Sequence, residues 1–187
     1  MKFLGSLVVL ISTSLMLQSP LLQAGETADP AGQVTKSEVA GVYNYSVTGD
    51  GFGFGGATEP SAMALLQEQG FATVINLRLD SEEGANVEQG RAAAEAAGLD
   101  YVHLPFDSKN PAPGYFDEFL AAVQDKAKQP VYIHCGSATR AAALWMSKRV
   151  LADDWSMEAA AEEARAIAGK PDAAVDFATG YIETLEQ

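Results

Sequence analysis

Cys135 and Arg140 are the two residues whose types and spacing could do chemistry together. The apolar run Val131–His134 leads directly into Cys135, and four small residues separate this cysteine from Arg140, namely Gly136, Ser137, Ala138 and Thr139. Small residues let consecutive backbone N–H groups turn inward around a tetrahedral anion, and a helix that begins near Arg140 adds partial positive charge. The guanidinium can hold two oxygens of the anion, and the same field favours the reactive thiolate. The loop is therefore expected to bind an anion against a thiolate.

Each of the two residues also has an ordinary structural interpretation. Cys135 is the single cysteine of the 187 residues, and a lone cysteine at the end of a strand is often a small buried hydrophobic residue. Arg140 could be a surface charge in a first helical turn. The helix dipole disfavours a basic residue at that position unless an anion is bound, so we favour the anion site.

Apolar runs of strand length alternate along the chain with segments of helical period. We expect strands over 42–47, 73–77, 101–104 and 131–134, and helices over 60–69, 86–97, 115–128, 140–151, 157–168 and 172–185. Strands separated by helices predict an α/β fold, with a mainly parallel central sheet flanked by helices on both faces. Ligands bind at the carboxyl ends of strands in such sheets, so the loops after Leu77, Leu104 and His134 are expected to form the site.

The segment 49–56 has five glycines in eight positions and predicts a loop. This loop could border the site, and its Phe52 and Phe54 could contact a substrate. A plain flexible loop is the alternative that we favour.

The first 24 residues have the pattern of a secretory signal peptide. Lys2 precedes the apolar stretch 3–17, and Ala24 is a small residue at the expected cleavage point. An uncleaved membrane anchor is the alternative. Residues 25–41 are polar and predict a flexible lead-in, and residues 42–187 are expected to form one domain. The protein is therefore expected to be periplasmic or secreted, without stable membrane insertion after cleavage.

The chain is strongly acidic, with a formal net charge of −13. Such a charge repels nucleic acids and anionic membrane surfaces, so we expect no nucleic-acid partner. Any site for an anionic ligand must depend on local groups. The oligomeric state is not indicated by the sequence.

Three further segments accompany the Cys–Arg motif. They are Gly55-Gly56, residues 70–78 (GFATVINLR) with Glu82 and Glu83 close behind, and residues 98–105 (GLDYVHLP). Together with His134-Cys135 and Arg140, they resemble the bacterial beta-lactamase hydrolase-like (DUF442-type) phosphatases. These proteins are relatives of the dual-specificity, cysteine-dependent protein phosphatases. The resemblance extends from about Tyr43 to Leu151 and implies the same fold.

The resemblance implies a two-step reaction on a phosphorylated protein or small molecule. Cys135 would attack phosphorus and form a phosphocysteine, while Arg140 and the backbone of residues 136–139 would stabilise the equatorial oxygens. A carboxylic acid would protonate the leaving oxygen, and water would then hydrolyse the intermediate. His134 would orient the loop and favour the thiolate. No metal or cofactor is expected, because the chain has only His103 and His134 as histidine ligands.

The acid is assigned to Asp107, because the loop 105–111 occupies the place where dual-specificity enzymes carry theirs. Asp117 is the second candidate. Asp107 beside Ser and Asn could instead be a turn residue. Ala138 stands where this family usually has glycine, and would strain the loop if that position needs a positive φ. Ala141 replaces a Ser or Thr that assists thiolate release, so binding is expected to exceed turnover.

Two other functions fit the same loop. A four-residue spacing between Cys135 and Arg140 also resembles the rhodanese sulfurtransferases, in which the cysteine carries a persulfide. The upstream Gly-His-Ile-like segment of those domains is absent from this sequence. A non-catalytic module that binds phosphate or a phosphopeptide is the second alternative, with Ala138 and Ala141 as signs of lost chemistry.

Overall fold

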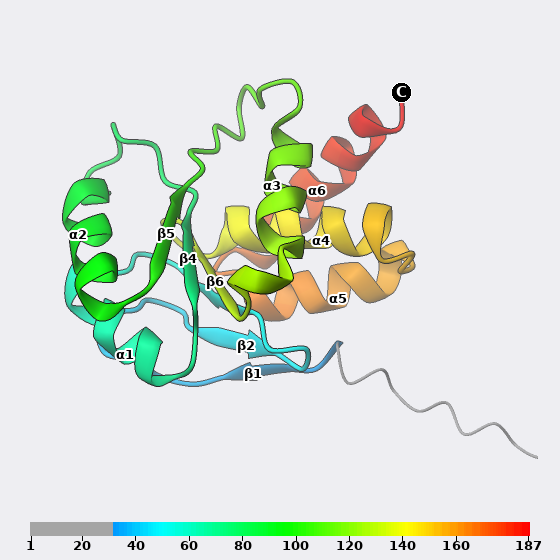
Figure 1. The fold of residues 1–187 in the computed structure, drawn as a ribbon. Coiled ribbons are helices and arrows are strands. Elements are labelled where there is room, and N and C mark those ends of the chain that lie inside the picture. Colours follow the sequence, from blue (N-terminus) through cyan, green and yellow to red (C-terminus); the bar gives the residue numbers. More distant parts are fainter. Residues whose placement is uncertain (1–31) are drawn as a thin grey trace, which may run out of the picture.

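A six-stranded mixed sheet forms the centre of the computed structural model, which describes residues 32–187. The strand order is β1-β2-β3-β6-β4-β5 (Figure 1). The bounds are β1 Val34–Lys36, β2 Ser46–Thr48, β3 Gly53–Gly55, β4 Thr73–Asn76, β5 Asp100–His103 and β6 Val131–His134. Strands β3, β6, β4 and β5 pair in parallel, while β2 pairs in antiparallel fashion with both β1 and β3. The predicted mainly parallel sheet is confirmed.

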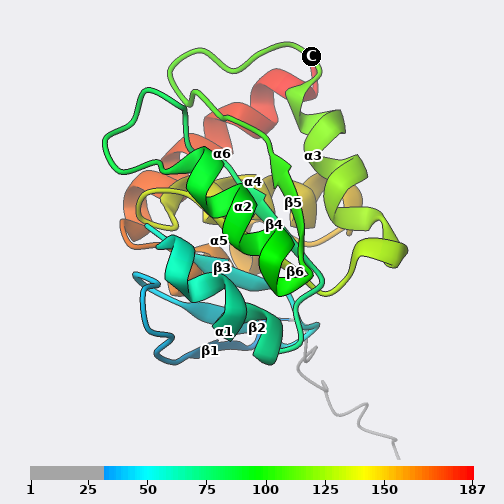
Figure 2. The same ribbon diagram turned by 60° about the vertical axis from the view of Figure 1, so that its left-hand side comes forward.

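Helices cover both faces of this sheet. Figures 1 and 2 show α1 and α2 on one face and α3 to α6 on the other. The bounds are α1 Met63–Glu68, α2 Val87–Ala97, α3 Tyr115–Gln124, α4 Thr139–Ala152, α5 Met157–Ile167 and α6 Pro171–Leu185. Short 3₁₀ turns occupy Pro60–Ala62 and Lys126–Lys128. Within residues 32–187, no helix combines the length and the apolar character needed to cross a membrane.

Alternating side chains of the central strands divide the core between the two faces. Val74 and Tyr132 belong to a cluster with residues of α1 and α2. Ile75 and Ile133, their neighbours along the strands, belong to the larger cluster with α3 to α6. This period of two is what strands buried on both faces require.

The segment 49–56 is not the flexible loop that its glycines predict. Gly53–Gly55 form β3, which pairs with the central strand β6. Phe54 is fully buried, and its ring lies 5.2 Å from that of Trp145. A Cβ at Gly53 would overlap with the ring of Phe71, and one at Gly55 with the Tyr132 hydroxyl. The glycines therefore permit close packing rather than flexibility.

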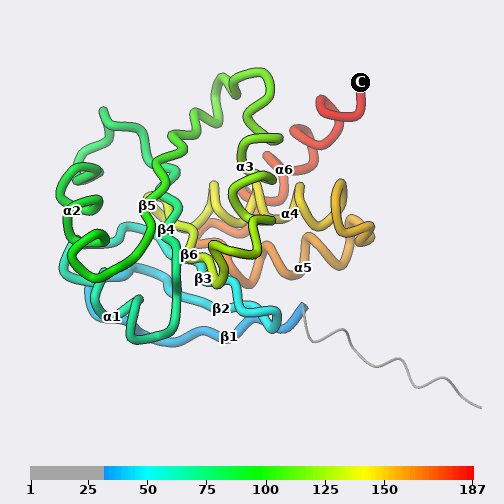
Figure 3. The backbone as a smooth tube through the Cα atoms, viewed as in Figure 1, coloured from blue at the N-terminus to red at the C-terminus, as the bar shows by residue number. Residues whose placement is uncertain are grey.

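The N-terminal predictions fall partly outside the described residues. This holds for the signal peptide of residues 1–24 and for the first part of the lead-in over 25–41. Within the described part, Val34–Lys36 form β1, so the lead-in is not flexible throughout. The Lys36 ammonium donates a hydrogen bond to the Ile167 carbonyl, and the first strand therefore lies beside the end of α5 (Figure 3). The strand predicted over 42–47 begins only at Ser46, because Asn44 has a positive φ of 54°.

Candidate active site

The loop between β6 and α4 lies at the centre of the carboxyl edge of the sheet. Strand β6 has the predicted bounds Val131–His134, and α4 begins at Thr139, one residue before the predicted start. Since β6 lies between β3 and β4, the loops that follow β3 and β4 flank the loop on either side. Cys135 is buried, with an exposed fraction of 1%, and carries a free thiol.

Two backbone hydrogen bonds orient the peptide groups of the loop between β6 and α4. The Gly136 carbonyl accepts a hydrogen bond from the Ala57 N–H at 2.9 Å, and the Ser137 carbonyl accepts one from the Gly169 N–H at 2.9 Å. Because the C=O and N–H of a trans peptide point in opposite directions, the Ser137 N–H faces away from Ala57. Within residues 32–187, no oxygen accepts a hydrogen bond from the N–H groups of Gly136, Ser137, Thr139 or Arg140. Such unpaired N–H groups at a helix N-terminus can hold an anion.

Ala138 adopts the conformation that the sequence analysis identified as a possible source of strain. Its φ is 63° and its ψ is −2°, in the left-handed region. The other described non-glycine residues with a positive φ are Asn44, Asn86 and Asp154, and Asn and Asp tolerate this region better than Ala does. The loop therefore carries a strained residue at the place where glycine would be relaxed.

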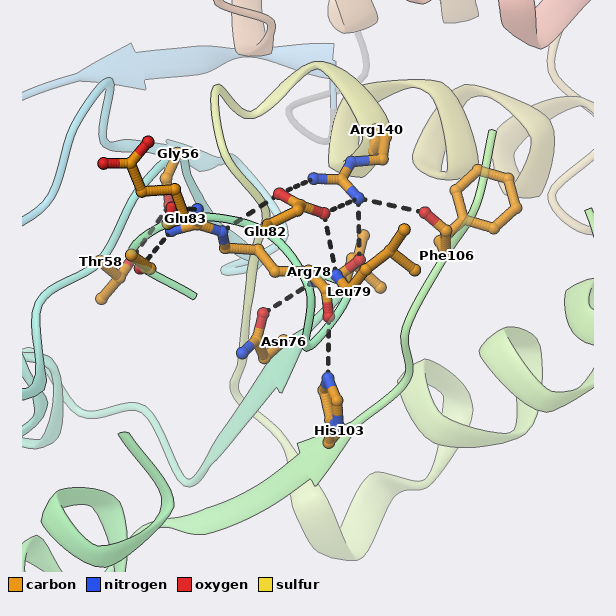
Figure 4. Close-up of polar contacts among 12 residues, drawn as sticks. Gly56, Thr58, Asn76, Arg78, Leu79, Glu82, Glu83, His103, Phe106 and Arg140 are labelled. Atoms are coloured by element: carbon orange, nitrogen blue, oxygen red, sulfur yellow. Dashed lines mark hydrogen bonds and ion pairs between the residues drawn. The ribbon is translucent and has the colours of Figure 1, made fainter. Parts of the chain in front are cut away.

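Arg140 is held from one edge by a carboxylate. Its Nη1 donates to Glu82 Oε1 at 2.7 Å, and its Nη2 donates to Glu82 Oε2 at 2.8 Å (Figure 4). Nη1 also contacts the carbonyls of Leu77 at 3.2 Å and Phe106 at 3.1 Å. In the described part of the chain, no oxygen accepts from Nε. Glu82 therefore fixes the guanidinium through Nη1 and Nη2, and the guanidinium also forms a hydrogen bond with the Cys135 side chain.

Charge and burial both act on this pair. Burial lowers the pKa of Arg140, but the hydrogen bond to Glu82 and the negative charges of Cys135 and Glu82 outweigh it, so this pKa is raised. Burial raises the pKa of Glu82, and the hydrogen bonds from Arg140, the Leu79 N–H and Arg78 together lower it below its usual value. Both groups are therefore charged at neutral pH, and the guanidinium is close enough to interact with the Cys135 thiol.

Arg78 organises the loop that carries Glu82. Its Nη1 and Nη2 each donate to a backbone carbonyl, of Gly84 and Glu83, at 2.6 Å, and its Nε lies 3.3 Å from Glu82 Oε2. The Arg78 N–H donates to Asn76 Oδ1, and its carbonyl contacts His103 Nε2 at 2.8 Å. Figure 4 shows that the Glu82 carboxylate is reached by Arg78 Nε, by the Leu79 N–H and by the Arg140 guanidinium. The loops after β4 and β5 are thereby tied to Arg140.

Sequence reasoning did not assign a role to Glu82 or Arg78. Their spacing of four residues directly after a predicted strand was the available signal, since this places both at the carboxyl edge of the sheet. The contact with Arg140 joins residues 58 positions apart, and it follows only once β4 is known to be the neighbour of β6. The contribution of Gly169 was missed for the same reason.

His134 has a different environment from the one expected. It is 1% exposed, and its ring stacks on Tyr132 at a centroid distance of 5.8 Å. Burial, reinforced by the charge of Arg78, lowers its pKa to about 3 against the weaker contrary effect of the backbone of Gly56 and Cys135. Neither ring nitrogen makes a well-aligned hydrogen bond within the described residues. A neutral ring supplies no positive charge to the Cys135 side chain. Its role in orienting the loop stays a prediction.

The two candidate acids, Asp107 and Asp117, are both exposed. Asp107 is exposed, and its Oδ1 accepts a hydrogen bond from the Lys109 N–H at 2.9 Å, as in an Asx turn. The preceding carbonyl, that of Phe106, is bonded to Arg140, so Asp107 is one residue away from an Arg140 contact. Asp117 lies in the first turn of α3. The structure brings Cys135, residues 136–139 and Arg140 together, and leaves both carboxylates outside this group.

The residues from β2 to α4, which include the loop from Cys135 to Arg140, match a known protein family. The model of the beta-lactamase hydrolase-like protein, phosphatase-like domain, matches residues 46–152. The chain belongs to this family. A beta-lactamase hydrolase-like protein of Agrobacterium fabrum is 37% identical over 86 residues. That match covers 43% of this chain and 19% of the relative, so the chain spans about a fifth of the length of that protein.

Solved structures show the same architecture. The DUF442 protein of Shewanella putrefaciens is 27% identical, with a TM-score of 0.57, over 75% of this chain and 92% of that one. TpbA of Pseudomonas aeruginosa is 19% identical with a TM-score of 0.63, over 80% and 89%. The catalytic domain of Siw14, a PP-IP phosphatase of Saccharomyces cerevisiae, is 18% identical with a TM-score of 0.57, over 78% and 84%. The fold is therefore that of the dual-specificity-like phosphatases.

Proposed function

We propose that this protein hydrolyses phosphate monoesters through a phosphocysteine intermediate on Cys135. The proposal rests on the Arg140 guanidinium, which Glu82 holds within hydrogen-bonding reach of the Cys135 side chain, beside unpaired backbone N–H groups. A tetrahedral dianion can accept hydrogen bonds from all of these donors at once. Membership of a phosphatase-like family supports phosphate as that anion. So does a related fold solved with phosphotyrosine, that of TpbA.

The first step forms the intermediate. The Cys135 thiolate attacks phosphorus, so that an S–P bond forms while the P–O bond to the ester oxygen breaks. The departing oxygen takes a proton from the Asp107 carboxyl group. Arg140 and the N–H groups of Gly136, Ser137 and Thr139 stabilise the charge on the three equatorial oxygens. Positioning by Glu82 keeps the guanidinium in place, so little reorganisation is needed during the reaction.

The second step releases the enzyme. Water attacks phosphorus, gives a proton to the Asp107 carboxylate, and the S–P bond breaks to regenerate the thiolate and inorganic phosphate. Ala141 follows Arg140 and is fully buried without a hydroxyl group. This supports slower thiolate release than in relatives that have Ser or Thr at the position, and we expect phosphate binding to be the better preserved property.

The nucleophile is tested with p-nitrophenyl phosphate. Cys135→Ser is expected to lose hydrolysis and to keep the binding of inorganic phosphate. Arg140→Lys should lower kcat/KM by about a hundredfold or more, because a lysine cannot replace the bidentate edge. Hydrolysis at the normal rate by Cys135→Ser would contradict the mechanism. Binding without any hydrolysis by the wild type would point to a non-catalytic phosphate module. Thiocyanate formation from thiosulfate and cyanide, without phosphate release, would point to a sulfurtransferase.

The acid is tested by varying the leaving group. Asp107→Asn should slow the hydrolysis of an alkyl phosphate by about a hundredfold or more, because an alkoxide cannot leave without a proton. The same variant should affect p-nitrophenyl phosphate much less, because its leaving group is stable as an anion. Asp117→Asn serves as the matched control, and should leave both rates near the wild-type values. Equal slowing of both esters by Asp107→Asn would remove the assignment.

A further inference from the structure

A groove lies between the segment 111–114 and helix α6, near the candidate active site. It has a volume of about 600 Å³, and Phe177, Gly180, Tyr181 and Leu185 line its α6 side. Figure 1 shows the loop between β5 and α3 and helix α6 at the same end of the molecule. The volume falls within the range of small-molecule pockets, roughly 300–1,000 Å³. We call it the α6 groove.

The α6 groove shares two lining residues with a cavity beside Arg140. A second, smaller cavity of about 160 Å³ is lined by Thr139, Arg140, Ala143 and Ala173 together with Ser108 and Phe177. Ser108 and Phe177 line the α6 groove as well. Phe177 therefore lies between the cavity beside Arg140 and the α6 groove. The ester group of a phosphate held by Arg140 would have to pass Phe177 to reach the groove.

Aromatic rings form the wall of the groove. The rings of Phe177 and Tyr181 stack with a centroid distance of 5.4 Å, and both contact the ring of Phe106, at 5.6 Å and 5.9 Å. Phe106 is fully buried, and its carbonyl accepts a hydrogen bond from Arg140. A flat aromatic group gains both apolar burial and ring stacking on such a wall.

The charges of the lining exclude a second anionic group. Among the described residues that line the two cavities, Arg140 is the only cation, and Asp176 is the only other charged residue. A leaving group with its own phosphate or carboxylate would meet Asp176 and find no basic partner. The groove therefore favours a neutral group and disfavours polyanionic esters.

We propose that the α6 groove binds the leaving group of the substrate, and that this group is aromatic and carries no negative charge besides the ester phosphate. The inference rests on the proposed phosphatase function and adds a substrate class to it. Helix α6, Pro171–Leu185, lies outside residues 46–152, to which the family model extends. Specificity is thus assigned to a part of the chain that the family match does not include.

The experiment compares three aryl phosphates on the full chain. Phenyl phosphate and 2-naphthyl phosphate have similar leaving groups and differ by one ring, while 3-carboxyphenyl phosphate adds a negative charge. The wild type should prefer the naphthyl ester over the phenyl ester by about tenfold in kcat/KM, since a ring of apolar surface is buried. The carboxyphenyl ester should be the poorest of the three.

Gly180 provides a variant that narrows the groove without disturbing the fold. A Cβ at this helical position meets no atom within 4 Å, and its φ is not in the left-handed region. Gly180→Leu should abolish the preference for the naphthyl ester, and leave competitive inhibition by inorganic phosphate unchanged. Gly180→Ala is the matched control, because it makes the same change of helix propensity with little bulk, and it should keep the preference.

The results separate this proposal from the one on which it rests. Equal kcat/KM for the naphthyl and phenyl esters, or a preference that persists in Gly180→Leu, would overturn the role of the groove and leave the phosphatase function standing. Absence of hydrolysis of all three esters by the wild type would overturn the phosphatase function and the leaving-group site with it.

Discussion

Ala138 introduces backbone strain into the loop from Cys135 to Arg140, which we call the active loop. Its left-handed conformation, with φ of 63°, costs an alanine roughly 1 kcal/mol relative to glycine. Burial and the surrounding backbone contacts maintain it, since Ala138 is fully buried. The strain is stored next to the groups that we propose bind the anion, and strained residues are commonly found at such sites.

Ala138→Gly should therefore raise the free energy of unfolding by about 1 kcal/mol. Urea denaturation measures it. Ala92→Gly, at an exposed position in the middle of α2, is the control, and should lower the free energy of unfolding by up to about 1 kcal/mol. A loss of stability in both variants would show that Ala138 is not strained.

Glu82 can affect phosphate binding in two opposite ways. Its negative charge repels a phosphate, whereas its two hydrogen bonds position Arg140. We expect positioning to dominate, so that Glu82→Ala weakens the binding of inorganic phosphate by about tenfold. Titration calorimetry measures the dissociation constant of phosphate. The constant of Glu82→Gln, which keeps one acceptor, should lie between those of the wild type and Glu82→Ala.

Glu83→Ala is the matched control for this prediction. It removes the same charge at the next residue, and only the backbone carbonyl of Glu83 takes part in the hydrogen bonds of the described structure. Phosphate binding should be unchanged or slightly tighter in this variant. Tighter binding in both variants would mean that repulsion outweighs positioning.

At the scale of elements, the connection between α5 and α6 supports the active loop from outside the family match. Gly169, in this connection, donates its N–H to the Ser137 carbonyl, and a Cβ at Gly169 would overlap with that same oxygen. The loop is thus held in part by a residue that follows all six strands in the sequence.

Gly169→Ala should displace the Ser137 peptide and lower kcat/KM for p-nitrophenyl phosphate by about tenfold or more, because small displacements of binding groups are costly. Steady-state kinetics tests this. Gly32→Ala, where a Cβ would make only van der Waals contact with the Trp155 ring, adds the same methyl group and is the control, which should keep the normal rate. A Gly169→Ala enzyme with wild-type kinetics would show that this contact does not shape the loop.

Most elements of the sheet could be predicted because each has a local signal. Strand β6 is a short apolar run between Pro130 and Cys135, and its predicted bounds are confirmed. Strand β3 could not be predicted, because its glycines are explained only by the rings of Phe71 and Tyr132 that pack against them. Intrinsic propensity opposes a strand there, and tertiary packing overrides it.

The candidate site divides in the same way. The loop from Cys135 to Arg140 is contiguous in the sequence, so its residues could be found from their types and spacing. Glu82 and Gly169 reach this loop only through the order of the strands and the packing of the last helices. Long-range contacts of this kind leave no pattern in a single sequence.

His134 is one group through which the stability of the folded protein depends on pH. Its pKa in the folded state is about 3, while the usual value is 6.5. As the pH falls below 6.5, the unfolded chain binds a proton that the folded protein does not, so stability is lost by up to about 1.4 kcal/mol per pH unit. Between about pH 7 and about pH 5, the loss from this residue should be about 2 kcal/mol.

His134→Leu should show a smaller loss of unfolding free energy over the same interval, because no imidazole remains to be protonated in the unfolded chain. Urea denaturation at the two pH values measures the difference between the two slopes. Identical slopes for the wild type and the variant would contradict a depressed pKa for His134.

The pattern of residues 1–24 bears on where the protein acts. We propose export to the periplasm or the outside of the cell, on the signal-peptide pattern of residues 1–24. The N-terminal sequence of the protein recovered from a bacterial periplasmic fraction tests the proposal. Residue 25 is the expected first residue, and recovery of the uncleaved chain from the cytoplasm would contradict it.

In the proposed mechanism, the phosphoryl group of the substrate is transferred to Cys135. Rapid quenching of the protein during turnover of an aryl phosphate, followed by mass spectrometry of its peptides, tests this directly. We predict the added mass of one phosphoryl group on the peptide that contains Cys135 in the wild type, and none in Cys135→Ser. A phosphoryl group on another residue, or continued turnover by Cys135→Ser, would contradict the account.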